Sequence, residues 1–181
     1  MHVSVPASVL DELEQLAVSL RRACDEHELL DASGKVPSPA PTMKMLQHVA
    51  TAQNLSRITM QLVTEFMTQL DNPPQLLVKA QSHLLAAVAH ACNAPALYAR
   101  AAQTTALPAA TAGELEAEQR KFRMIFDHAE ARSELQLASE AVRDATREVK
   151  RHHDTERFLA RVRGPAPANA ASPPGPKPKA R

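Results

Sequence analysis

Apolar residues recur along this chain at spacings of three and four, the period of an amphipathic helix. A first helix is expected from about Ser8, a candidate N-cap, to Asp31, and a second from about Thr42 to Asp71. The stripe of the first helix is formed by Val9, Leu13, Leu16, Ala17, Leu20, Ala23 and Cys24. Apolar residues cover two adjacent sides of the second helix, which favours a central position in a bundle.

A third helix is expected to begin at Pro73. Asn72 stands at the N-cap position, Pro73 suits the first helical position, and Gln75 completes a capping-box spacing. Pro95 is expected to kink or end this helix, because proline removes a backbone donor and clashes with the preceding turn. A short helical segment from Ala96 to about Thr105 could follow.

The last helix is expected to be very long. Thr111 and Glu114 have the spacing of a capping box, and no glycine or proline follows until Gly164. Roughly fifty residues at about 1.5 Å each would extend on the order of 75 Å, which is more than a small bundle can bury.

Two apolar stripes on this last helix are expected about half a turn apart. The first comprises Leu115, Phe122, Ile125, Phe126 and Ala129, and we expect it to face the bundle. The second comprises Leu135, Ala138, Val142, Ala145 and Val149, and we expect it to point elsewhere. The helix should therefore break near residues 129–133, or its distal half should pack against something else. A second copy of the chain is the simplest candidate.

These patterns predict an all-α protein, an antiparallel bundle of three to four helices with a long C-terminal helix. The bundle is assigned to residues 1–130 with a linker at 32–41, the distal part of the last helix to 131–163, and a disordered Pro/Ala/Lys tail to 164–181. With only 4 glycines and 3% aromatic residues, the composition disfavours β-sandwiches, barrels and glycine-rich nucleotide-binding loops.

The net charge of +1 conceals an asymmetry between the two parts of the chain. Residues 1–142 contain 11 Lys/Arg and 16 Asp/Glu, whereas residues 143–181 contain 10 and 4. The candidate basic ridge on the last helix comprises Arg143, Arg147, Lys150, Arg151, Arg157 and Arg161. Such a ridge could contact phosphates or an acidic protein surface. A solvated helix end is the more ordinary interpretation, because acidic residues are interleaved with the basic ones.

Metal sites and catalytic motifs have little support in the sequence. Glu148, His152 and Glu156 share a helical face, but ordinary ion pairs with nearby arginines explain them better. A zinc site is conceivable but disfavoured, because its candidate ligands do not form the tight local pairs of structural sites. Those ligands are Cys24, His27, His83, His90 and Cys92. No nucleophile elbow is present, and we expect no cofactor, no metal and no small-molecule substrate.

The two cysteines do not make a disulfide framework, and the N-terminus lacks the layout of a signal peptide. The most apolar window, Leu84 to Ala99, is too short to cross a bilayer. A cytoplasmic location without membrane contact is therefore expected.

The sequence favours a non-enzymatic interaction or scaffold protein with a protein partner. We expect a homodimer through the distal half of the last helix, with the second apolar stripe as its seam. The alternative is a nucleic-acid accessory protein that makes sequence-independent phosphate contacts through residues 143–163 and the tail.

Overall fold

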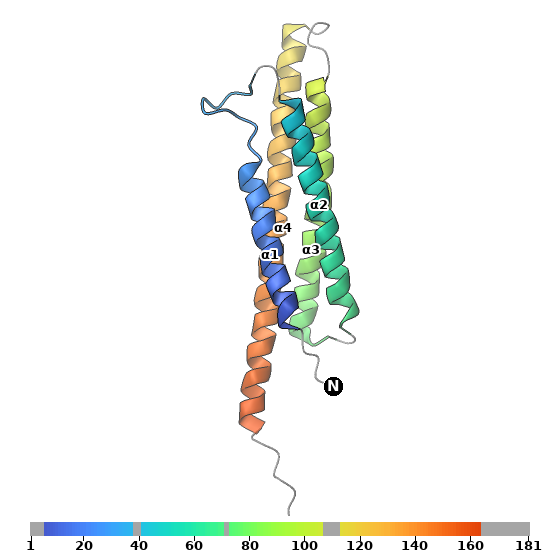
Figure 1. Cartoon of the computed structure of the whole chain (residues 1–181), viewed down its shortest axis with the longest axis vertical. Coiled ribbons are helices and arrows are strands. Elements are labelled where there is room, and N and C mark those ends of the chain that lie inside the picture. Colours follow the sequence, from blue (N-terminus) through green and yellow to red (C-terminus); the bar gives the residue numbers. More distant parts are fainter. Residues whose placement is uncertain (1–5, 38–40, 71–72, 107–112, 164–181) are drawn as a thin grey trace, which may run out of the picture.

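The computed structural model describes residues 6–37, 41–70, 73–106 and 113–163. These residues form four helices and no strand, so the predicted all-α bundle is confirmed (Figure 1). The helices are α1 (Ala7–Glu26), α2 (Thr42–Thr68), α3 (Gln75–Ala106) and α4 (Glu114–Arg163). The tail at 164–181 and the expected caps Asn72 and Thr111 lie outside the described residues.

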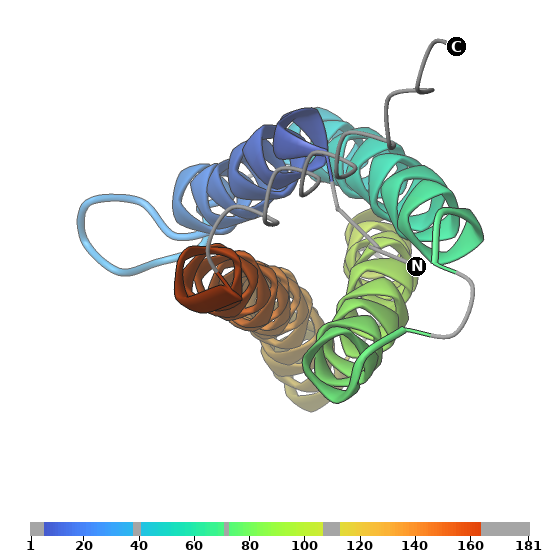
Figure 2. The same cartoon turned by 90° about the horizontal axis from the view of Figure 1, so that it is seen from below.

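The helices alternate in direction and are arranged as a ring, as the end-on view in Figure 2 shows. Each helix packs against those before and after it along the chain, and α1 closes the ring against α4. This is the up-down-up-down arrangement of an antiparallel four-helix bundle. The helix α4 is the longest, and its C-terminal end extends past the other three helices in Figure 1.

Alanine allows α3 and α4 to approach each other closely. The core stripe of α3 alternates large and small residues, as in Leu77, Ala80, Leu84 and Ala87. Because alanine at a helix contact shortens the distance between the axes, the alanine-rich stripes let the two helices pack over their whole shared length. The core stripe of α4 keeps a spacing of three and four throughout, with Met124, His128, Ala131, Leu135, Ala138, Val142, Ala145, Val149 and His152.

The predicted orientation of α4 is wrong. The second apolar stripe, expected outside the bundle, is fully buried, since Leu135, Ala138, Val142, Ala145 and Val149 are each 0% exposed within one chain. The first stripe, expected to face the bundle, is largely exposed, with Leu115 at 75%, Phe122 at 73% and Phe126 at 60%. Ile125 is partly buried and Ala129 is exposed.

The helix also does not break at residues 129–133, and the core stripe of α4 continues in the same register through residue 130. Both predictions assume that the largest apolar residues mark the core. In the structure, the small residues Ala131 and Ala138 lie on the buried face of α4 where the first stripe gives way to the second. The second stripe is therefore not available as a dimer seam in the folded chain.

Pro95 does not end α3, which continues to Ala106. An interior proline removes one backbone hydrogen bond and costs about 3 kcal/mol. Buried residues on both sides of the proline, Ala94 and Tyr98, continue the core stripe and offset that cost. The helix therefore continues through the proline and carries Tyr98 into the core.

The first helix ends at Glu26, five residues before the predicted end at Asp31. The N–H of His27 still donates to the carbonyl of Ala23, but the backbone of His27 then leaves the helix (φ −79°, ψ 71°). Asp31 organises the following turn, because its carboxylate accepts hydrogen bonds from Ser33 and from the N–H of Lys35. The N-cap position is Pro6, not the expected Ser8, and no side chain caps this helix.

Candidate functional sites

One buried polar layer crosses the bundle and takes one residue from each helix or its end. We call His27, His48, Tyr98 and His128 the histidine layer; the four are between 0% and 5% exposed. Each occupies a position in the core stripe of its own helix, where an apolar residue is usual. The layer separates the main apolar core from a smaller one formed by Leu29, Met45, Ala101, Ala102 and Met124.

The four rings pack directly against one another. The rings of His27 and His48 stack with centroids 4.1 Å apart, and Tyr98 meets both at steep angles with centroids 5.1 and 5.6 Å away. The Nε2 of His128 and the Nδ1 of His48 are 3.3 Å apart, so the two imidazoles share one hydrogen bond. Such a bond requires one nitrogen to donate and the other to accept, which two neutral imidazoles can do.

Burial keeps these histidines neutral. Loss of hydration lowers the pKa of His27 and of His48 from 6.5 to about 4, and that of His128 to about 3. Neighbouring positive groups, including Arg132 and Lys44, lower the pKa values further. Burial also raises the pKa of the Tyr98 hydroxyl.

Two polar atoms of the layer have no hydrogen-bond partner, the Nδ1 of His27 and the hydroxyl oxygen of Tyr98. Unpartnered buried polar atoms are costly, so this layer is less stable than an apolar one of the same shape would be. In the described part of the chain, no three His, Cys, Asp or Glu side chains are grouped so that they could hold a metal ion. The layer as packed is a buried polar element of the core in which burial favours neutral histidines.

The histidine layer was not predicted from the sequence, although the spacing contained the signal. His48, Tyr98 and His128 continue the three-and-four stripes of their helices and could have been assigned to the core on that basis. Of the side chains considered for zinc, only His27 belongs to the layer. His90 pairs with Glu134 at 2.7 Å, and the thiol of Cys92 contacts the hydroxyl of Ser56.

A second feature is the apolar tip, defined as Leu115, Phe122 and Phe126 at the N-terminal end of α4. These side chains lie four or seven residues apart and so share one side of the helix. They line a groove of about 1040 Å³, together with Thr104 of α3 and charged residues of α4. Aromatic residues are enriched at protein–protein contacts, so the exposed Phe122 and Phe126 make this end of α4 a candidate contact surface.

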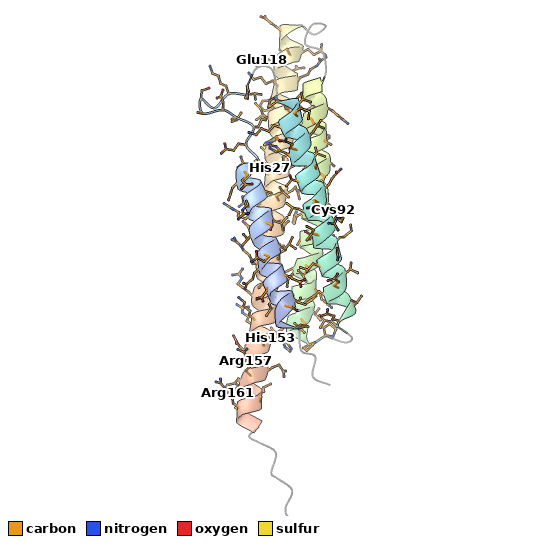
Figure 3. All side chains as sticks on the ribbon, viewed as in Figure 1. His27, Cys92, Glu118, His153, Arg157 and Arg161 are labelled. Carbon is orange, nitrogen blue, oxygen red and sulfur yellow. The ribbon has the colours of Figure 1, made fainter. Side chains whose placement is uncertain are left out.

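The basic ridge is exposed, but half of it is engaged in ion pairs. Arg147 pairs with Asp144, Arg151 pairs with Glu148, and Lys150 pairs with Glu14 of α1. These partners neutralise much of the positive field along the middle of α4. The two last members, Arg157 and Arg161, lie on the end of α4 that extends past the other helices (Figure 3).

The remaining metal candidates on α4 also have local partners. Glu148 pairs with Arg151, and His152 is buried at the end of the core stripe. Glu156 is half-buried on the same side of the helix.

The geometry defines the chain as an antiparallel four-helix bundle with a polar layer in its core, an architecture that serves many unrelated functions. Comparison of the sequence with family models, with curated proteins and with solved structures finds no match. None of the described helices combines the length and the apolarity needed to cross a membrane.

Proposed function

We propose that this protein is a non-enzymatic helical interaction protein that self-associates through the apolar tip of α4. A contrast along α4 supports this proposal. The second apolar stripe is buried against the other helices of the same chain, whereas Leu115, Phe122 and Phe126 are 60–75% exposed. A second copy is the occupant we favour. The tip offers an apolar face flanked by both signs of charge, which suits a self-complementary contact.

The contact is small, because it involves chiefly one helix from each copy. Interfaces below about 1,200 Å² are typical of weak and transient complexes. We therefore expect a dimer that dissociates on dilution through the micromolar range, rather than an obligate one.

Sedimentation equilibrium of the full chain at several concentrations tests the proposal. The wild type should approach the mass of a dimer as its concentration rises, and Phe122→Ser should remain a monomer. Because Phe122 is 73% exposed, this change should leave the helix content and the thermal unfolding of the monomer nearly unchanged.

The matched control is Leu85→Ser, which removes an apolar side chain that is 57% exposed on α3, away from the tip. It should dimerise like the wild type. A wild type that stays monomeric at every concentration would refute the proposal, as would a Phe122→Ser variant that dimerises normally.

A second candidate function is sequence-independent binding to nucleic acid by the free end of α4. Arg157 and Arg161 favour it, because they are exposed on the part of α4 that extends past the bundle (Figure 3). The ion pairs of Arg147 and Lys150 disfavour a contribution from the rest of the ridge.

A titration of duplex DNA at several salt concentrations tests this candidate. Truncation after residue 142 is not a suitable variant, because it would remove Ala145 and Val149 from the core. The double variant Arg157→Ala/Arg161→Ala should weaken binding and reduce its salt dependence, whereas Arg147→Ala should change it little. Absence of binding by the wild type at low salt would exclude this function.

A further inference from the structure

The charges around the apolar tip are divided into two short blocks. Glu114, Glu116 and Glu118 come first along the helix, and Arg120, Lys121 and Arg123 follow them. Apart from Arg120, which is half-buried and pairs with Glu116, these side chains are exposed. The tip is thus negative at its start and positive at its end.

The same residues flank the apolar side of the helix in a regular way. Glu116 and Arg123 are seven residues apart and project from the same flank, because seven residues make nearly two full turns. Glu118 and Lys121 are three residues apart and project from the opposite flank. Each flank of the apolar side therefore carries at least one negative charge and, further along the helix, at least one positive charge.

An antiparallel pair of tips would bring these charges together. With the two-fold axis between residues 119 and 120, Glu116 of one copy lies level with Arg123 of the second copy, and Glu118 lies level with Lys121 of the second copy. Leu115 then lies level with the gap between Phe122 and Phe126 of the second copy. Knobs would therefore enter holes without a further shift. A parallel pair would instead bring like charges together.

We propose that two copies of this chain dock tip to tip with their α4 helices antiparallel, and that Glu116–Arg123 and Glu118–Lys121 pairs between copies select this register. This inference rests on the proposed self-association and adds its geometry and the residues that determine partner choice. Opposed charges at helix flanks commonly set orientation and partner more than they add affinity.

Charge reversal tests the inference. One variant, Glu116→Lys/Glu118→Lys, makes the tip positive, and the other, Lys121→Glu/Arg123→Glu, makes it negative. Each variant alone should dimerise at least about tenfold more weakly than the wild type, because like charges then face each other. An equimolar mixture should restore dimers that contain one copy of each, measured by sedimentation with one variant fluorescently labelled.

The control Glu140→Lys reverses an exposed charge in the middle of α4 and should dimerise like the wild type. If the wild type dimerises but neither reversal weakens it, or if the mixture stays monomeric, the antiparallel register is wrong and the proposed function stands. If the wild type does not dimerise, both are wrong. Circular dichroism of each variant shows that the fold is retained.

Discussion

The imidazole rings of His27 and His48 stack face to face inside the bundle, with centroids 4.1 Å apart and an angle of 12° between their planes. His27 comes directly after the last residue of α1 and His48 lies in α2, so the stack joins two antiparallel helices. The contact is favourable only while both rings are neutral. Protonation of either ring would place a charge in the core beside positive neighbours such as Arg132.

We expect acid to destabilise the folded chain below pH 6.5. The folded-state pKa of His27 and of His48 is about 4, against 6.5 in the unfolded chain, so the unfolded chain binds protons first as the pH falls. Each such histidine should lower the free energy of unfolding by about 1.4 kcal/mol per pH unit between about pH 6.5 and about pH 4. Above pH 7 this contribution should be flat. Urea unfolding at a series of pH values measures it.

Replacement of one imidazole separates this effect from the titration of carboxylates. His48→Leu should remove the share of one histidine, about 1.4 kcal/mol per pH unit, from the slope between pH 6.5 and about 4, and the shares of His27 and His128 should remain. His83→Gln, which lies outside the histidine layer, is the control variant. Equal unfolding midpoints for the wild type at pH 7.5 and pH 5 would contradict the expectation.

Tyr98→Phe should leave the protein as stable as the wild type or raise the free energy of unfolding by about 1 kcal/mol, because the buried hydroxyl has no partner. Thr59→Val is the matched control: its hydroxyl is also buried, but it donates to the carbonyl of Leu55 at 2.8 Å. Loss of that bond should cost about 0.5–1.5 kcal/mol. Denaturant unfolding at pH 7.5 compares the two, and an equal loss in both variants would show that the Tyr98 hydroxyl is partnered.

The sequence predicts the helices well and the faces of α4 poorly. Proline and glycine locate the breaks: α2 begins at the predicted Thr42, and α4 begins at Glu114, three residues after the expected cap Thr111. Hydrophobicity alone cannot show that a stripe containing Ala131 and Ala138 is the core while one containing Phe122 is exposed. That choice depends on the partner helix, because alanine packs well only where a neighbouring helix comes close. The spacing within each helix assigns His48, Tyr98 and His128 to the core, but no single segment shows that their rings meet in one layer, because that depends on four helices together.

Leu135 and Leu137 distinguish the buried face of α4 from its exposed face within one helical turn. Leu135 is 0% exposed and Leu137 is 40% exposed. Leu135→Ala should lower the free energy of unfolding by about 2–5 kcal/mol through lost burial and a cavity. Leu137→Ala should change it by less than about 0.5 kcal/mol. If Leu135→Ala instead dissociates a dimer without destabilising the monomer, this stripe is a seam after all.

Pro95→Ala should raise the free energy of unfolding, because α3 continues through this position from Gln75 to Ala106. Alanine restores a backbone donor within the helix and relieves the clash of the proline ring with the preceding turn, a gain of up to about 3 kcal/mol.

Pro74→Ala is the control. Pro74 lies just before the helix, where its carbonyl accepts from Leu77 and its fixed φ costs nothing, so its replacement should be neutral or slightly destabilising. Thermal unfolding compares the Tm of each variant with that of the wild type. A lower Tm for Pro95→Ala would contradict this expectation and mean that the bundle is more stable with proline at this position.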